Sequence, residues 1–144
     1  MGKNLFDYHW FGSSKEVSWT YYGQPDFRAI PIYIGIGNSA TFSSNVPQTS
    51  PILLYAMNSL NASASSAVNG FSVSNSLTVQ ADINGYVYLC FVNTRQYYSD
   101  VANGTYYIQV ELGTEATPYE PYVDTSEELS KKLSDINEFL RVNL

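Results

Sequence analysis

The sequence predicts an all-β domain over residues 1–122, built as a sandwich or a barrel, followed by an α-helix over residues 123–144. Short segments rich in β-branched and aromatic residues recur up to residue 112, and turn residues separate them. By contrast, residues 125–142 contain neither Gly nor Pro and carry a helical repeat. A chain of 144 residues has the length of one domain that can bury a core.

Seven segments carry the strand signal. They are residues 16–22, 27–36, 40–43, 52–57, 77–82, 86–92 and 105–112. Turn or loop signals built on Gly, Pro and Asn lie at residues 23–26, 35–38, 69–70, 84–85 and 103–104. The Asn84-Gly85 pair predicts a tight hairpin with a type I′ turn between the strands on either side of it. The small, polar stretch 58–67 predicts a long surface loop.

The segment after the last predicted strand is expected to lie as an extended strap. Residues 106, 108, 110 and 112 share one apolar or aromatic face of that strand, which therefore is half-buried. Pro118 and Pro121 then remove backbone donors, so the chain cannot continue in a central strand. Tyr119 and Tyr122 are predicted to pin the strap to the domain as an aromatic clasp.

The predicted C-terminal helix carries a single apolar stripe made of Leu129, Leu133, Ile136 and Leu140. The stripe either packs on the chain's own β-domain or pairs with other copies as a short coiled coil. In the second case Leu occupies the a positions and Ile one d position, which favours trimers or tetramers over dimers. An isolated helix of roughly 18 residues is marginal in water, so the β-domains would have to add contacts.

Charge and composition exclude several classes of partner. The net charge of -6 and the pI near 4.5 argue against nucleic acid, which requires a clustered positive surface. No apolar run is long enough to cross a membrane, no polybasic segment is present, and the N-terminus lacks a signal peptide. One Cys and one His are too few for a zinc site within the chain, and no cofactor or metal is expected.

Enzyme signatures are absent from the sequence. It contains no G-x-S-x-G elbow, no P-loop and no complete dinucleotide-binding motif. The carboxylates of the β-domain are scattered, and the sequence gives no reason to bring two of them together as a glycosidase requires. We therefore expect a protein that is not an enzyme and has no catalytic residues.

The aromatic content fits sugar binding, which needs ring faces that stack on a pyranose and polar groups that bond its hydroxyls. The candidate residues are Trp10, Trp19, Arg95, Tyr97, Tyr98 and Asp100. Trp19 shares a strand face with Val17, so we expect it in the core before we expect it on a ligand platform. The other aromatics fall in predicted loops, where packing within the chain or against another subunit is the alternative to sugar binding.

The combination IQVELG-x-x-ATPYEPY at residues 108–122, with Asn4-Leu5-Phe6 near the start, resembles carbohydrate-binding-module-like jelly-roll domains. Such domains occur in tail, baseplate and fibre proteins of bacteriophages that infect Gram-positive hosts. The resemblance implies a jelly-roll-like antiparallel β-sandwich in a virion structural protein that is assembled in the host cytoplasm beside other virion proteins. It also implies adhesion to host-surface polysaccharide, and a purely architectural virion protein without a sugar site is the alternative.

Overall fold

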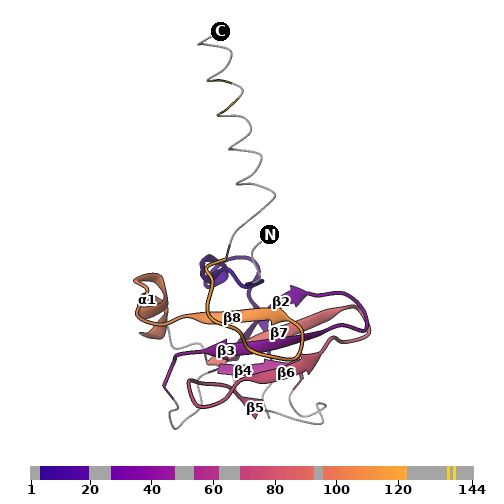
Figure 1. Cartoon of the computed structure of the whole chain (residues 1–144). Coiled ribbons are helices and arrows are strands. Elements are labelled where there is room, and N and C mark those ends of the chain that lie inside the picture. Colours follow the sequence, from indigo (N-terminus) through magenta and orange to yellow (C-terminus); the bar gives the residue numbers. More distant parts are fainter. Residues whose placement is uncertain are drawn as a thin grey trace.

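The computed structural model describes residues 4–19, 27–47, 54–61, 69–92, 96–122, 136 and 138. Within these residues the chain forms two antiparallel sheets that face each other (Figure 1). The elements in chain order are η1 (Tyr8–Trp10), β1 (Val17–Ser18), β2 (Phe27–Tyr33), β3 (Ser39–Ser44), β4 (Leu54–Met57), β5 (Asn69–Gly70), β6 (Leu77–Gln80), β7 (Tyr86–Val92), α1 (Gln96–Ala102) and β8 (Ile108–Leu112). The predicted β-sandwich is confirmed at this level.

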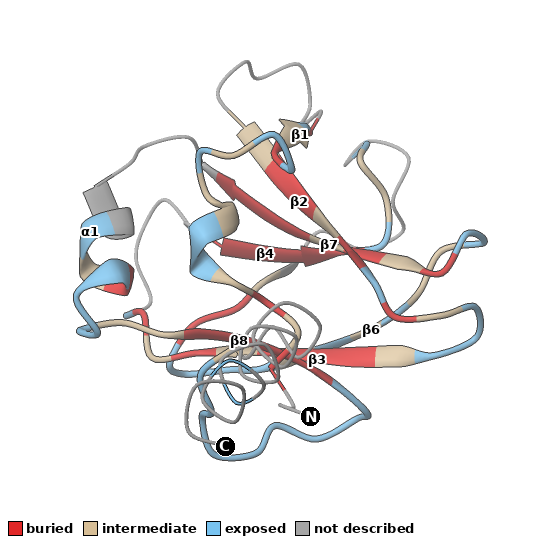
Figure 2. Cartoon of the chain, turned by 90° about the horizontal axis from the view of Figure 1, so that it is seen from above, coloured by how far each residue is buried: buried red, intermediate tan, exposed pale blue. Residues whose placement is uncertain are grey.

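One sheet has five strands in the order β1-β2-β7-β4-β5, and the other has three in the order β6-β3-β8. The longest pairing joins β2 to β7, from Phe27 opposite Val92 to Tyr33 opposite Tyr86. Seen from above, β2, β4 and β7 form one layer, and β3, β6 and β8 form the other (Figure 2). The strand pairs of the described residues are all antiparallel.

The main core lies between the two sheets. Alternate residues of each strand point inward, so Ile30, Leu89 and Phe91 from the five-stranded sheet meet Phe42 and Val110 from the other sheet. Each of these five side chains is fully excluded from solvent. Burial of this apolar surface is the main stabilising term of the fold.

A second cluster covers the outer face of the five-stranded sheet. It consists of Trp19, Ala29, Tyr55, Met57 and Cys90, all of which are buried. The expectation that Trp19 belongs to the core is therefore confirmed. Cys90 is a free, buried thiol that packs as a small apolar side chain, and burial raises its pKa well above the usual value.

The predicted hairpin at Asn84-Gly85 is wrong, because β6 and β7 belong to different sheets. The turn is centred on Ile83 and Asn84: the Gly85 N–H donates to the Asp82 carbonyl at 3.0 Å, and the Asp82 N–H donates to the Tyr86 carbonyl at 2.8 Å. Gly85 follows the turn with a φ of 90°, and a Cβ there would lie 2.8 Å from the Tyr33 ring. The dipeptide specifies a reversal of the chain but not the sheet that each flanking strand joins.

Two other local predictions are also corrected. Asn69 and Gly70, predicted as a turn, form β5 and pair with Ala56 and Tyr55. The segment after residue 95, predicted as a loop, contains α1, a helix that is anchored by the buried Val101. Both elements are short and depend on tertiary contacts that local propensity does not contain.

The C-terminal segment 123–144 is described only at Ile136 and Glu138, and Ile136 is exposed. The predicted helix and its contacts at Leu129, Leu133 and Leu140 lie outside the described residues. The coiled coil and the boundary at residue 122 therefore stay predictions. Within the described part of the chain, no helix is long and apolar enough to span a bilayer.

Candidate functional site

Both ends of the β-domain meet at strand β8. The Leu5 N–H donates to the Val110 carbonyl at 2.7 Å, so the N-terminal segment extends the sheet beyond β8. The Asn4 side-chain oxygen accepts from the backbone N–H groups of Phe6 and Val110, each at 3.1 Å. In this way the Asn4-Leu5-Phe6 step covers an edge whose backbone groups would otherwise need other partners.

The strap formed by residues 113–122 crosses the outer face of β8, where two buried polar side chains hold it. Gln109 and Glu111 are 0% and 3% exposed. The Glu111 carboxylate accepts from Gln109 Nε2 at 2.8 Å, from Thr117 Oγ1 at 2.6 Å and from the Thr117 N–H at 3.2 Å. The Glu120 N–H donates to Gln109 Oε1 at 2.9 Å. This network fixes the strap, and the aromatic residues of the predicted clasp complete the attachment.

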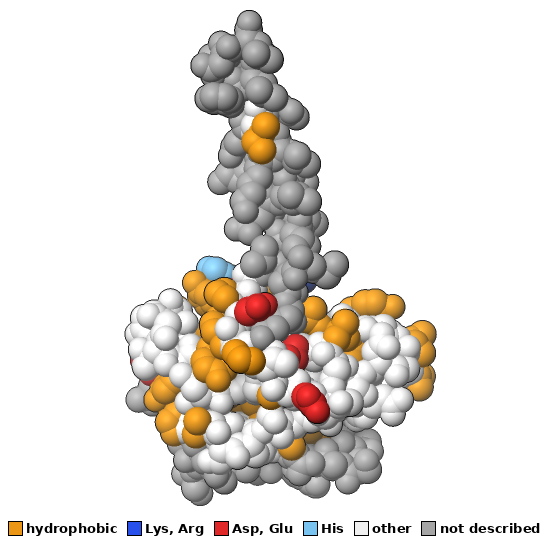
Figure 3. All heavy atoms as spheres, in the orientation of Figure 1, with side chains coloured by type: hydrophobic (Ala, Val, Ile, Leu, Met, Phe, Trp, Pro, Cys, Tyr) orange, Lys and Arg blue, Asp and Glu red, His pale blue; other side chains and the backbone are white. Residues whose placement is uncertain are grey.

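A cleft of about 390 Å³ opens where this strap passes η1 and the turn after α1. Its walls are rich in aromatic rings, namely Phe6, Tyr8, Tyr106, Tyr107, Tyr119 and Tyr122, and Asp7 and His9 stand among them. Figure 3 shows hydrophobic side chains gathered beside the histidine on this part of the surface. The volume falls within the roughly 300–1,000 Å³ of typical ligand sites.

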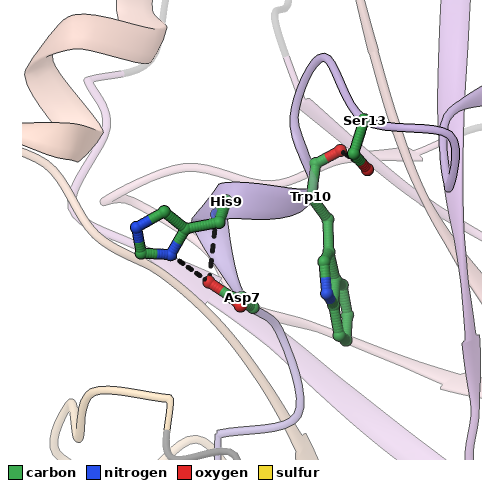
Figure 4. A network of polar contacts seen from close by, with 4 residues as sticks. All are labelled: Asp7, His9, Trp10 and Ser13. Atoms are coloured by element: carbon green, nitrogen blue, oxygen red, sulfur yellow. Dashed lines mark hydrogen bonds and ion pairs between the residues drawn. The ribbon is translucent and has the colours of Figure 1, made fainter.

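One wall of the cleft comes from η1 and its N-terminal cap. The Asp7 carboxylate caps η1 by accepting from the His9 N–H at 3.0 Å, and the same oxygen, Oδ1, lies 2.8 Å from His9 Nδ1 (Figure 4). The imidazole also stacks on the Tyr8 ring, with centroids 4.0 Å apart. Because an ionised carboxylate only accepts hydrogen bonds, Nδ1 carries a proton and His9 Nε2 is left for a ligand.

The strap contributes another part of the cleft lining, which includes Tyr119 and Tyr122. The Tyr119 ring stacks on Tyr107 with centroids 4.5 Å apart, and its position depends on the Glu111 network beneath it. Burial and the nearby Tyr8 raise the pKa of the Tyr119 hydroxyl, so it stays protonated and can donate a hydrogen bond at neutral pH. Tyr8 and Tyr119 are 37% and 42% exposed, so each still presents ring surface to solvent.

Trp10 faces the other side of η1 and packs against the core (Figure 4). Its ring makes edge contacts with Phe6 and Tyr122, at centroid distances of 6.0 and 5.5 Å, and Lys15 Nζ lies 4.8 Å from its centroid. Trp10 thus holds the end of the strap and does not line the cleft. Its role as a sugar ligand stays a prediction.

The segment containing η1 is itself held by a buried carboxylate. Glu16 accepts a hydrogen bond from the Gly12 N–H, and its other oxygen lies 3.5 Å from Arg28 Nε on β2. A buried charge is tolerated only when it is paired and hydrogen-bonded. Glu16 therefore ties the loop after η1 to the five-stranded sheet and fixes the wall that carries Tyr8 and His9.

Of the remaining candidates, the structure describes only the side chain of Asp100, which does not line the cleft. Arg95 lies outside the described residues, and so do the side chains of Tyr97 and Tyr98, whose backbone belongs to α1. Asp100 is half-buried on α1, and its carbonyl accepts from the Tyr106 N–H at 3.0 Å. The sugar contacts of Arg95, Tyr97 and Tyr98 stay predictions.

Sequence reasoning missed the grouping of Tyr8, His9 and Tyr107 with Tyr119. His9 reads as an isolated surface residue because its partners in the cleft arrive from the other end of the domain. The spacing of Asp7 and His9, which allows a capped turn, is the one local signal of this wall. Among the described residues, no cluster of three or more His, Cys, Asp or Glu side chains could hold a metal ion.

Three kinds of comparison with known proteins gave no match: no protein-family model, no curated protein and no solved structure is similar to this chain.

Proposed function

We propose that this chain is a saccharide-binding module and that the aromatic cleft is its binding site. The observation that carries this proposal is the convergence of two stacked ring pairs, Tyr8–His9 and Tyr107–Tyr119, with the Asp7 carboxylate in one concave site. A pyranose offers an apolar face to such rings, and its hydroxyl groups can bond to carboxylate, imidazole and phenol groups.

The wider role that we propose is that of a virion structural protein, displayed on a phage tail, baseplate or fibre and adhering to host-surface glycan. The resemblance of residues 4–6 and 108–122 to phage jelly-roll modules supports this role. The jelly-roll-like connectivity, the absence of catalysis and the assembly beside other virion proteins belong to the same proposal.

Self-association through residues 123–144, with a trimer as the favoured state, would join several copies of a weak saccharide site in one particle. Several linked sites gain avidity without new contacts, provided that they can engage one surface together. Light scattering of the full chain, beside a version that ends at Tyr122, checks this part. A trimeric full chain with a monomeric short version is expected, and equal masses would refute association through this segment.

Binding of the full chain to immobilised cell-wall polysaccharide from Gram-positive bacteria tests the saccharide site. Tyr119→Ala removes a ring of the cleft and is expected to weaken binding by about 1 kcal/mol, or roughly fivefold. Tyr33→Ala is the matched control, because Tyr33 is a 63% exposed tyrosine on β2 that does not line the cleft. No binding by the full chain, or equal binding by both variants, would end the proposal.

An architectural role without sugar is the second candidate, and one observation favours it. The rings of Tyr107 and Tyr119 already stack on each other, and Trp10 already packs on Tyr122, so these aromatics stabilise the strap even without a ligand. A blank binding assay, together with loss of thermal stability in Tyr119→Ala, is the result expected for this role.

A further inference from the structure

We infer that the cleft prefers saccharides that carry a free, protonated amino group over neutral N-acetylated or phosphate-bearing ones. This inference rests on the proposed function and names the chemical class of the ligand. It depends on the negative charge of Asp7, beside η1, and on the partial negative charge of the exposed tyrosine ring faces.

One oxygen of the Asp7 carboxylate is available to a ligand. Both of its interactions with His9 use Oδ1. The second oxygen, Oδ2, makes no hydrogen bond to another described residue, and the side chain stays 20% exposed beside the cleft. An ammonium group on a ring that enters the cleft can therefore donate to Oδ2 without displacing the cap of η1.

The exposed rings add to this preference. The face of a tyrosine ring carries partial negative charge and attracts a cation that lies over it. Tyr8 and Tyr119 both line the cleft, and both are partly exposed. A sugar that stacks on Tyr119 thus finds a carboxylate and a second ring face within one site, and both favour a positive substituent.

Negatively charged substituents on a sugar are disfavoured in the cleft. The two cationic side chains in the described part of the chain are engaged elsewhere, Lys15 over the Trp10 ring and Arg28 with Glu16. A phosphate in the cleft would approach the Asp7 carboxylate and the ring faces instead. The net charge of -6 on the whole chain further lowers the local concentration of anionic polymers and raises that of cationic ones.

Calorimetric titration of the full chain with three probes at about pH 6, where most amino groups of a glucosamine oligomer are protonated, tests the inference. The probes are an oligomer of glucosamine, the same oligomer fully N-acetylated, and poly(glycerol phosphate). We expect the glucosamine oligomer to bind about fivefold more tightly than the acetylated one, the effect of one exposed ion pair and one cation–π contact. Poly(glycerol phosphate) is expected to bind more weakly than either.

Asp7→Asn is the decisive variant, because Asn still caps η1 through its side-chain oxygen but carries no charge. It should remove the ion-pair part of the preference, so that the roughly fivefold gap between the two oligomers narrows to about twofold, while the acetylated oligomer binds as before. Glu115→Gln, on the exposed part of the strap, removes one charge away from the cleft and should leave the preference unchanged.

The outcomes separate the two proposals. Equal affinities for the two oligomers, tighter binding of the phosphate polymer, or an equal loss in the two variants would overturn the amino-sugar inference. If Tyr119→Ala still weakens saccharide binding in those cases, the cleft remains the binding site. If the wild-type chain binds neither oligomer nor cell-wall polysaccharide, the proposed function itself fails.

Discussion

The attachment of the strap through Glu111 leads to the sharpest prediction about stability. Glu111→Ala removes the acceptor of three hydrogen bonds, from Gln109 Nε2 and from the backbone and hydroxyl groups of Thr117. Each bond to a charged acceptor contributes at least about 1 kcal/mol net, which sums to about 3 kcal/mol. Because the strap itself is exposed and can regain water, we expect the free energy of unfolding to fall by about 2–3 kcal/mol.

Glu111→Gln is the matched variant. Its amide oxygen can still accept from Gln109 and from the Thr117 N–H, and the Thr117 hydroxyl can rotate to accept from the new amide. The charge is lost but the shape is kept, so the expected loss is at most about 1 kcal/mol. The difference between the two variants isolates the hydrogen bonds from the charge.

Urea unfolding, followed by tyrosine and tryptophan fluorescence, measures both variants. The same samples report on the cleft, because Glu111→Ala should also weaken saccharide binding by freeing Tyr119 from its place against Tyr107. The reasoning is refuted if Glu111→Ala unfolds within about 0.5 kcal/mol of wild type at an unchanged m-value. That result would mean that the strap is held by its aromatic contacts alone.

Two further predictions concern titratable groups away from the cleft. Partial burial acts to raise the pKa of Asp82, but hydrogen bonds from the Tyr88 hydroxyl and from the Tyr86 and Asn84 N–H groups hold it below its usual value. Asp82→Asn should therefore unfold up to roughly 0.5 kcal/mol more easily at neutral pH, because solvent screens the interactions of this partly exposed carboxylate. The gap should close at a pH well below the usual pKa of an aspartate, once the carboxylate of the folded chain is protonated. Urea titrations at the two pH values check it, and a gap independent of pH would contradict the assignment. Cys90 should resist thiol reagents in the folded chain, because it is buried and its raised pKa keeps it protonated, and should react once urea unfolds the protein; immediate modification of the folded chain would contradict its burial.

Part of the fold could be predicted because it is encoded locally. Alternation makes β8 recognisable as a strand, a run of β-branched and aromatic residues does the same for β7, and the prolines after residue 113 keep the strap out of a central strand. The same alternation predicts that Trp19 is buried, and the structure confirms it. These features follow from a side-chain period of two and from the missing donor of proline, and neither depends on the rest of the chain.

Sheet membership and the cleft were decided by contacts between distant parts of the chain. The sequence near Asn84-Gly85 does not predict that β6 pairs with β3 while β7 pairs with β2. Pairing depends on how well whole strand faces fit together. The cleft likewise needs His9 from one end of the domain and Tyr119 from the other. These residues come together because both the N-terminal segment and the strap bind to β8. The sequence by itself determined the strands other than β5, the strap and the buried tryptophan, since these are local properties. The tertiary structure alone determined β5, the sheet that each strand joins and the aromatic rings that form a site.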